Sequence, residues 1–404
     1  MADPAVSAAL LGLGLAIMLG VALGELANLL RLPDIVLFLL LGIVLGPGVG
    51  LLVPHAFPVL TQVIVLFGAA YLLFEGGRSL NGDDLRSAAA GVFWLATVGV
   101  LLTGGIVAVA GHYLLGVSWP ISLLLGAVVA PTDPAVIAPL FAALPIRRRL
   151  AALALAESAA NDATAASLAA VASGVVRSRR LDLLAAGGTL LWQFLVGAAV
   201  GVVLGAVSHI AERRLGQRAH TVRPLVALVA VLLSYGLASA LGASGFLSAF
   251  VAGLLTGRAH RRAGRADPVA LNFYEYHAGT TGRAVRILVF TLLGASLSLH
   301  VVLPLWLPAF GVVLVLILVA RPLTVQLLRL DRRARWTGKE ILFTSWVRET
   351  GVVPAALAAL LLASGTPGAP QIAATVTVAL LVTVILQVPT TRALAARLGL
   401  LSQE

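Results

Sequence analysis

The sequence predicts an all-α polytopic membrane protein of about 13 transmembrane helices, built as two inverted six-helix repeats with crossed broken helices. The chain has 404 residues, of which 60% are hydrophobic and only 11% are charged. A soluble domain is usually about a quarter charged. The apolar residues form segments of about 20, the length that crosses a bilayer. Interrupted helices at corresponding places in two halves are typical of inverted-repeat transport proteins.

The apolar segments follow one another with short connections. They lie at 5–25, 33–53, 57–77, 86–111, 119–143, 150–175, 187–210, 223–241, 244–258, 284–299, 301–328, 339–363 and 371–395. The longest polar connection, 259–282, is expected to lie at the cytoplasmic surface. No soluble domain is predicted between the segments.

The basic residues predict the orientation in the membrane. With the N-terminus outside, 24 of the 28 Lys and Arg residues fall at cytoplasmic positions, Arg321 among them. Only Arg177, Arg179 and Arg180 fall outside, and Arg348 lies within a span. Because Lys and Arg are enriched in cytoplasmic loops, membrane orientation explains the net charge of +11 better than nucleic-acid binding. We expect a multi-pass protein of the inner (cytoplasmic) membrane, with its C-terminus in the cytoplasm.

The seventh apolar segment carries no ionised residue and is expected to connect two repeats. The first repeat would be residues 1–180, the connecting helix 181–221 and the second repeat 222–404. A single connecting helix between two six-helix repeats places the repeats in opposite orientations. We expect spans 3–6 and 10–13 to form the core and the remaining spans a scaffold.

The motif Thr132-Asp133-Pro134 predicts a broken helix in the fifth span. Pro134 removes a backbone donor and Pro131 restricts its neighbour. The break exposes amide groups with partial positive charge and carbonyl groups with partial negative charge. Asp133 can neutralise the amide end, while a carbonyl near Thr132 can face a cation. An Asp133 that only caps a kinked helix is an equally good interpretation.

Asp162 is the strongest candidate for carrying an ion. Ionisable residues inside the membrane are rare and mark ion or proton pathways. Burial disfavours an isolated carboxylate, which can be neutralised by one proton or one cation but not by both. Ser158 and Asn161 supply neutral oxygens nearby, and such hard ligands suit alkali cations. The alternative is a structural Asp paired with an arginine.

Glu157 lies five residues before Asp162 and therefore faces another side of the helix. Arg348 is expected to be the only basic residue deep in a span, where an unpaired arginine is very unfavourable. We therefore expect a structural ion pair between Glu157 and Arg348. Glu349 is the alternative partner for Arg348, and the role of Thr350 is open.

Glu75 lies near the cytoplasmic end of the third span. It is either an interfacial residue beside Arg78 or an additional acid on a cation path. The sequence does not favour one of these interpretations over the other.

These residues resemble a known family, the monovalent cation/proton antiporters of the bacterial sodium/proton exchanger type. The resemblance covers essentially the whole chain. It rests on Thr132-Asp133-Pro134, Glu157-Ser158-x-x-Asn161-Asp162, Leu41-Gly42-x-x-Leu45-Gly46-Pro47, Phe246-Leu247-Ser248-x-Phe250-x-Ala252-Gly253 and Phe290-x-x-x-Gly294. The family's usual Arg-Gly pair in the second broken helix is replaced here by Arg348-Glu349-Thr350-Gly351.

The resemblance implies that Asp162 is a shared site for a proton and for Na⁺, Li⁺ or K⁺. Thr132 and Ser158 would be further ligands, helped by Glu75, and Asp133 would compensate helix ends. The asparagine at Asn161 implies the electroneutral branch, with one proton exchanged per cation. The resemblance further implies a homodimer with the scaffold spans at its interface, and the ions are transported substrates, so no cofactor is expected.

Three other functions are weighed against exchange. A cation channel could use the same carboxylate, although buried acids beside two broken helices favour a closed site. A sodium-coupled organic anion symporter shares the inverted-repeat plan but needs free amide ends or arginines for the anion. An intramembrane enzyme is disfavoured because neither His-x-x-x-His with Glu nor Gly-x-Ser-x-Gly occurs.

Overall fold

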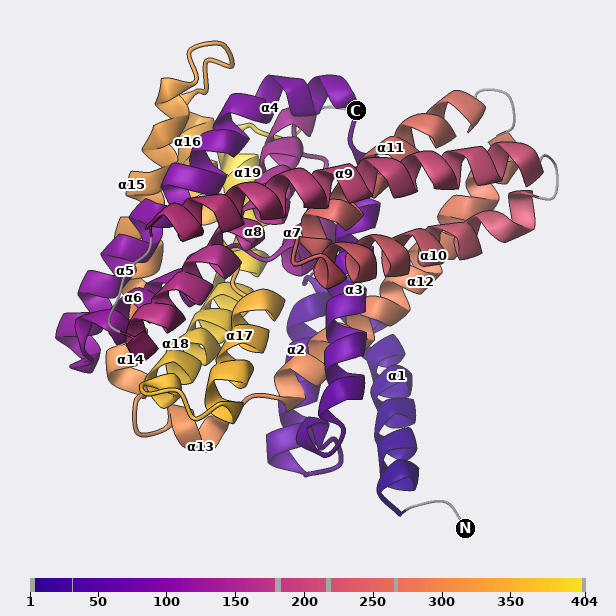
Figure 1. Ribbon diagram of the computed structural model, residues 1–404. Helices are drawn as coiled ribbons and strands as arrows, with labels where there is room; N and C mark the ends of the chain where they lie inside the picture. The colour runs from indigo at the N-terminus through magenta and orange to yellow at the C-terminus, as the bar shows by residue number, and fades with distance from the viewer. Residues whose placement is uncertain (1–3, 31, 179–182, 216–218, 265–267, 402–404) are drawn as a thin grey trace.

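The computed structural model describes residues 4–30, 32–178, 183–215, 219–264 and 268–401, and they are almost entirely helical. The α-helices are α1 (Pro4–Leu30), α2 (Asp34–Ile43), α3 (Pro58–Ser79), α4 (Gly82–Trp94), α5 (Val100–Leu115), α6 (Trp119–Val129), α7 (Pro134–Ala142), α8 (Arg148–Ser178), α9 (Leu183–Leu215), α10 (Ala219–Ala240), α11 (Gly245–Gly264), α12 (Pro268–Ala295), α13 (Leu299–Val302), α14 (Trp306–Val315), α15 (Arg321–Val325), α16 (Gly338–Trp346), α17 (Val352–Ala363), α18 (Ala369–Val382) and α19 (Val388–Leu398). Short π or 3₁₀ turns join several of them into continuous rods (Figure 1).

Within the described segments, 8 helices are long and apolar enough to cross a membrane. Shorter apolar helices cover Asp34–Gly48, Gly245–Gly257 and Val352–Ala363. The predicted all-α membrane fold is confirmed, whereas the count of 13 spans and the two inverted repeats stay predictions. The first helix begins at the lower edge of Figure 1 and α19 ends towards its upper edge.

The predicted polar connection over 259–282 is helical for most of its length, and its place at the cytoplasmic surface stays a prediction. Helix α11 continues to Gly264 and α12 already begins at Pro268, so most of this stretch is helical. A helix of 28 residues is longer than the roughly 30 Å apolar thickness of a bilayer. The polar first part of α12 can therefore project beyond the membrane without leaving the helix.

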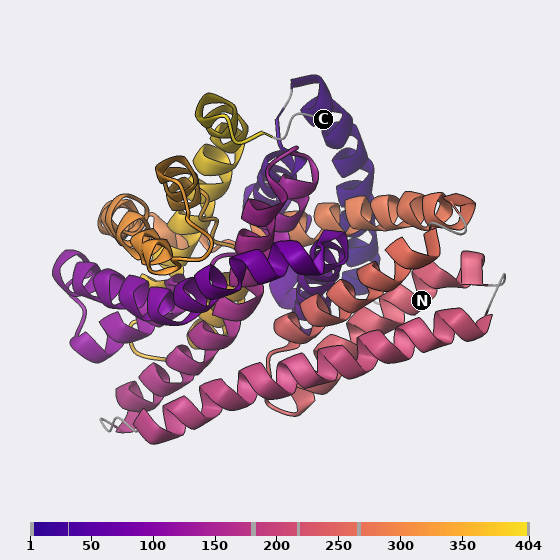
Figure 2. The same cartoon turned by 90° about the horizontal axis from the view of Figure 1, so that it is seen from above.

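The helices form two groups that lie side by side in Figures 1 and 2. One group, the core group, contains α4–α8 and α13–α19; the other, the scaffold group, contains α1–α3 and α9–α12. We predicted the third and tenth spans in the core, but these are α3 and α12, and they pack along α11 and α2. This packing assigns them to the scaffold group.

Glycines let the scaffold helices approach at backbone distance, which explains two of the sequence motifs. A Cβ on Gly42 of α2 would collide with the backbone of α12 at Thr291, and one on Gly294 would collide with the backbone of α2. Gly253 of α11 faces the backbone of Phe74 in α3 in the same way. Small residues at such contacts are the usual basis of helix packing in membranes.

Two interrupted helices cross in the core group. The first consists of α6 and α7, with residues 130–133 between them, and the second of α16 and α17, with residues 347–351 between them. The backbone N–H of Asp133 donates to the carbonyl oxygen of Glu349 at 2.9 Å. Pro134 stands at the first turn of α7, where its missing donor is tolerated. The predicted crossing of broken helices is therefore present.

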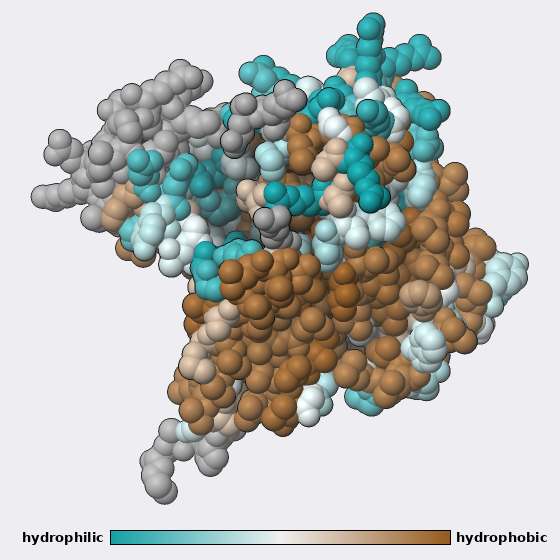
Figure 3. Space-filling model, turned by 180° about the vertical axis from the view of Figure 1, so that it is seen from behind, coloured by the Kyte–Doolittle hydropathy of each residue, from teal (hydrophilic) through white to brown (hydrophobic). Residues whose placement is uncertain are grey.

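The surface separates into an apolar band and a polar end. Figure 3 shows hydrophobic residues over most of one face and hydrophilic residues gathered above them. Of the predicted outer basic cluster, Arg179 and Arg180 lie outside the described residues, and only the backbone of Arg177 is described. The apolar band is the expected surface for contact with lipid tails.

Candidate functional site

Asp133 connects the two half-helices that begin at the crossing. Its Oδ1 accepts the backbone N–H of Ala135 at the start of α7 at 2.8 Å. Its Oδ2 accepts the backbone N–H of Val352 at the start of α17 at 2.5 Å. Helix N-termini carry partial positive charge and leave amide donors unpaired. One carboxylate therefore satisfies donors at both N-termini.

Gly351 makes room for this arrangement. A Cβ at Gly351 would overlap the carboxylate of Asp133. The φ angle of Gly351 is −164°, outside the left-handed region that favours glycine, and the steric overlap is the constraint that the structure shows. The sequence Thr350-Gly351 thus allows Asp133 to reach the start of α17.

Arg348 binds the C-terminal end of α6, on the other side of the break in the first interrupted helix. Its Nη2 donates to the carbonyl oxygens of Val129 and, at 3.0 Å, of Ala130, and Nη1 donates to Thr350 Oγ1 at 3.0 Å. Val129 is the last residue of α6. The guanidinium therefore lies at a helix C-terminus, where a cation is favourable. The side chain is only 1% exposed.

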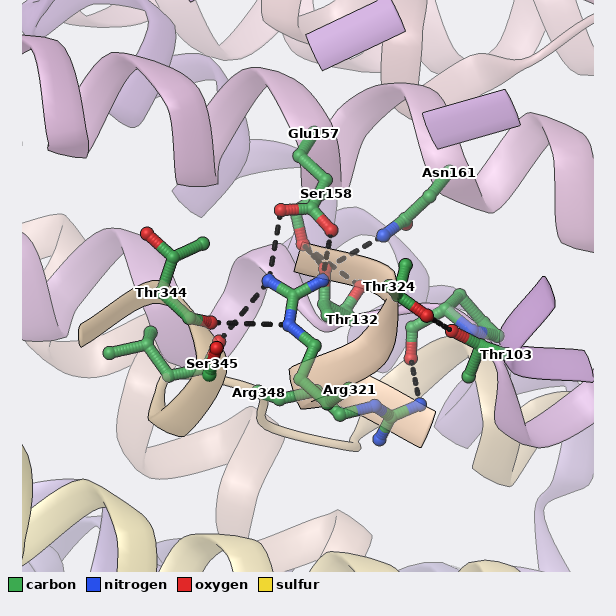
Figure 4. A network of polar contacts seen from close by, with 12 residues as sticks. Thr103, Thr132, Glu157, Ser158, Asn161, Arg321, Thr324, Thr344, Ser345 and Arg348 are labelled. Carbon is green, nitrogen blue, oxygen red and sulfur yellow. Dashed lines mark hydrogen bonds and ion pairs between the residues drawn. The ribbon is translucent and has the colours of Figure 1, made fainter. Parts of the chain in front are cut away.

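The predicted ion pair between Glu157 and Arg348 is wrong. Glu157 instead binds Arg321 of α15, with Nη1–Oε1 at 2.5 Å and Nη2–Oε2 at 3.0 Å (Figure 4). A guanidinium and a carboxylate match each other in this two-point geometry. Since Arg348 is already engaged by the carbonyl groups that end α6, it does not need Glu157.

Arg321 also lies against a helix C-terminus. Its Nε donates to the carbonyl oxygen of Thr344 at 3.2 Å, and Nη2 lies 3.4 Å from that of Val347, the residue after α16. We placed Arg321 at a cytoplasmic position, yet it is 4% exposed. An arginine followed by Pro322 inside an apolar run was the sequence signal that could have identified this buried residue.

Asp162 lies in the middle of α8, close to the crossing. It is 3% exposed, and neither carboxylate oxygen has a hydrogen-bond partner among the described residues. A buried ionised carboxylate without partners is highly unfavourable. A proton or another cation at this residue would remove that cost.

Neutral oxygens accompany Asp162 on the same helix and on the break. Asn161 Nδ2 donates to Thr132 Oγ1 at 2.8 Å, Thr132 Oγ1 and Ser158 Oγ lie 2.9 Å apart, and Ser158 Oγ donates to the carbonyl oxygen of Thr132 at 2.9 Å (Figure 4). These bonds orient the amide so that Asn161 Oδ1 is left without a partner among the described residues. The structure thus brings Thr132, Ser158 and Asn161 together next to Asp162.

Glu349 and Thr350 lie in the break of the second interrupted helix. Glu349 is fully buried, and both of its carboxylate oxygens lack a hydrogen-bond partner in the part of the chain that the structure describes. The Thr350 N–H donates to Thr383 Oγ1 at 3.1 Å, in addition to the contact of its hydroxyl with Arg348. Glu349 therefore does not pair with Arg348, which the sequence left as an alternative.

Glu75 is bound by Arg78 and Tyr274. Its Oε2 accepts Arg78 Nε at 2.8 Å, and its Oε1 accepts the Tyr274 hydroxyl at 3.0 Å. Gly76, the next residue, faces Leu155 of α8, which lies seven residues or about 10 Å along the helix from Asp162. This geometry favours the interfacial interpretation over an acid on the cation path.

The comparison with protein families settles which family this fold represents. A profile described as "Sodium/hydrogen exchanger, transmembrane" matches residues 14–397. The chain belongs to the sodium/hydrogen exchanger family. The match covers nearly the whole chain, so the predicted relation to monovalent cation/proton antiporters is confirmed.

Individual members of the sodium/hydrogen exchanger family are similar over most of the chain. The K(+)/H(+) antiporter NhaP of Alkalimonas amylolytica is 29% identical over 369 residues, which are 90% of this chain and 62% of that protein. The K(+)/H(+) antiporter NhaP2 of Shewanella oneidensis is 30% identical over 360 residues, 86% of this chain and 60% of that protein. The chain thus spans less than two thirds of the length of these relatives.

An archaeal relative links sequence and structure. The Na(+)/H(+) antiporter 1 of Methanocaldococcus jannaschii is 28% identical over 360 residues, 86% of this chain and 81% of that protein. A solved structure of the sodium proton antiporter MjNhaP1 from the same organism superposes with a TM-score of 0.78, at 26% identity and over 98% of this chain and 100% of that one. The fold described above is therefore shared by solved antiporters.

Proposed function

We propose that this chain is a secondary active transporter that exchanges a monovalent cation for a proton at Asp162. The observation that supports it most directly is the carboxylate of Asp162, which is buried without a hydrogen-bond partner among the described residues. The neighbouring helix ends are already neutralised by Asp133, Arg348 and Arg321. Asp162 is therefore the residue that would bind the exchanged ion.

The cation would bind to oxygens only. Asp162 would supply the charge, Thr132 and Ser158 the hydroxyl oxygens, and Asn161 its free amide oxygen. Hard oxygen ligands suit Na⁺, Li⁺ and K⁺. Among the relatives are proteins named K(+)/H(+) and Na(+)/H(+) antiporters, and both ions are candidate substrates here.

A one-for-one exchange follows from charge. Asp162 is neutral when it holds one proton and equally neutral when it holds one monovalent cation. A cycle that alternates between these two states moves no net charge across the membrane. We propose this electroneutral stoichiometry, with access to Asp162 alternating between the two sides.

We further propose a multi-pass protein of the inner membrane, with the N-terminus outside and the C-terminus in the cytoplasm, acting as a homodimer. The basic residues of the predicted cytoplasmic loops support the orientation. We place the dimer interface on the scaffold group, where α9 carries large exposed apolar side chains, among them Leu191, Trp192 and Leu195.

Exchange in proteoliposomes tests the proposed function. A K⁺ or Na⁺ gradient is imposed and the internal pH is followed, with Asp162→Asn as the matched variant. Wild type should exchange protons for the cation, and the variant should not. A membrane potential alone should drive no proton flux. Exchange that persists in Asp162→Asn would exclude Asp162 as the shared site.

A further inference from the structure

Glu349 shares with Asp162 a property that no other buried acid in the described chain has. Both oxygens of each of these two carboxylates lack a hydrogen-bond partner from any other described residue. By contrast, Asp133 accepts two backbone N–H groups, and Glu157 binds Arg321. Glu349 is the more deeply buried of the two unpartnered acids, at 0% exposure against 3% for Asp162.

The two arginines around Glu349, Arg348 and Arg321, bind other groups. Arg348, its neighbour in the chain, directs its guanidinium to the carbonyl groups that end α6 and to Thr350. Arg321 is bound by Glu157 and by the end of α16. Asp133, whose N–H donates to the Glu349 carbonyl, adds a further negative charge. No described arginine or lysine makes an ion pair with Glu349.

The formal charges leave two acids to be neutralised. Six of the buried charged residues lie at the crossing or bind the helix ends there, and four of these six cancel one another: Asp133, Glu157, Arg321 and Arg348. The remaining two are Asp162 and Glu349. One exchangeable ion at Asp162 therefore leaves one negative charge in the crossing, and an uncompensated buried charge is strongly destabilising.

A proton fits Glu349 better than a metal cation does. An alkali cation needs several oxygen ligands, and the Thr350 hydroxyl is taken up by Arg348. A proton needs no such cage, because it forms one O–H bond with the carboxylate and converts it into a neutral carboxylic acid.

We propose that Glu349 is a second proton-binding site, which holds its proton while Asp162 exchanges one. The proton comes from the aqueous phase and stays on Glu349 in both the proton-loaded and the cation-loaded states of Asp162. This inference rests on the proposed function, since it assigns the exchanged ion to Asp162. A retained proton on Glu349 explains how the crossing can contain two unpaired acids and still exchange one proton for one cation.

Infrared spectroscopy of the protein in lipid tests the protonation state directly. At saturating Na⁺ or K⁺, Asp162 is ionised by its bound cation, yet the carbonyl stretch of a protonated acid should remain. The band should persist in Asp162→Asn and be lost in Glu349→Gln. Glu75→Gln is the matched control, because Glu75 is ion-paired with Arg78 and its replacement should leave the band unchanged.

Transport by Glu349→Gln completes the test. Glutamine resembles a neutral glutamic acid in shape, so the variant should keep exchange that is driven by the cation gradient and carries no current. Loss of exchange in folded Glu349→Gln would show that this residue takes part in the exchange and would overturn a retained proton. If this variant does not fold, the absence of the acid band from cation-saturated wild type and from Asp162→Asn would overturn it independently. Exchange retained by Asp162→Asn would instead contradict the proposed function.

Discussion

Glu157 and Arg321 form a two-point ion pair, with nitrogen–oxygen distances of 2.5 and 3.0 Å, that joins α8 to α15 inside the protein. The side chains are 3% and 5% exposed. Because Arg321 also donates to the carbonyl oxygen of Thr344, the pair fixes the end of α16 relative to the helix that carries Asp162. It is a structural link beside the candidate ion site and not part of it.

Breaking this pair should destabilise the protein. Glu157→Gln leaves a buried guanidinium without its counter-charge, and the loss of one partner of a buried pair costs about 3–5 kcal/mol. Thermal unfolding in detergent should show the loss. A double-mutant cycle with Arg321→Gln should give a large coupling energy, whereas a cycle of Glu157→Gln with Arg348→Gln should give little. A large coupling energy between Glu157 and Arg348 would indicate that these two residues form the ion pair, which would contradict the structure.

Gly351→Ala should disturb the crossing. The added Cβ overlaps the Asp133 carboxylate, so the hydrogen bond from the Val352 N–H is lost or displaced, at about 1.5–3 kcal/mol for a bond to a charged group. Gly279→Ala is the control, since a Cβ there meets nothing within 4 Å. Exchange and thermal stability should fall in Gly351→Ala alone. Equal behaviour of the two variants would refute the close approach.

Arg348→Met should impair folding even though Glu157 keeps its partner. The change leaves the carbonyl oxygens of Val129 and Ala130 without their cationic donor, and a buried unsatisfied group costs about 1–3 kcal/mol. The yield of monodisperse protein and its unfolding temperature measure the effect. Arg348→Lys should recover only part of it, because an ammonium group lacks the planar fork of donors. Full recovery by lysine would mean that charge alone matters.

Glu75→Gln should leave exchange intact. The carboxylate of Glu75 is held by Arg78 and Tyr274, so its neutralisation weakens the end of α3 without changing the ligands of Asp162. Initial exchange rates at saturating cation should match those of wild type. Rates that fall to the level of Asp162→Asn would place Glu75 on the ion path after all.

Competition between ions predicts the pH dependence of transport. Where most Asp162 residues carry a proton, each unit of lower pH should raise the apparent KM for the cation about tenfold, because one proton and one cation compete for one carboxylate. Exchange rates measured against cation concentration at several pH values give this slope. An apparent KM that does not change with pH would contradict a shared site.

Much of the fold could be predicted because its causes are local. Apolar segments of membrane-spanning length identified the helices, Pro134 marked the first break, and the polar run Arg348-Glu349-Thr350-Gly351 marked the second. The motif at Gly42 contributed only to the family resemblance, and the structure places its glycine against the backbone of Thr291 and Gly294. These signals depend on one segment at a time, so a single sequence shows them.

The partners of charged side chains were harder to predict. Arg321 and Arg348 are both arginines in apolar surroundings, and the sequence does not show which one faces Glu157. We counted Arg321 among the cytoplasmic residues, although the predicted span 301–328 runs beyond it and the helical rod of the structure continues to Leu330, nine residues or about 13 Å further. That extension carries Arg321 inward to Glu157. The unpartnered state of Glu349 likewise depends on contacts that only the folded chain defines.

The proposed exchange depends on one carboxylate, that of Asp162, which binds either a proton or an alkali cation. The most direct measurement is the proton release of purified protein when K⁺ or Na⁺ is added in weakly buffered solution, compared with Asp162→Asn. We predict about one proton released per chain by wild type and none by the variant. Cation binding without proton release by wild type, or equal release by the variant, would contradict the account.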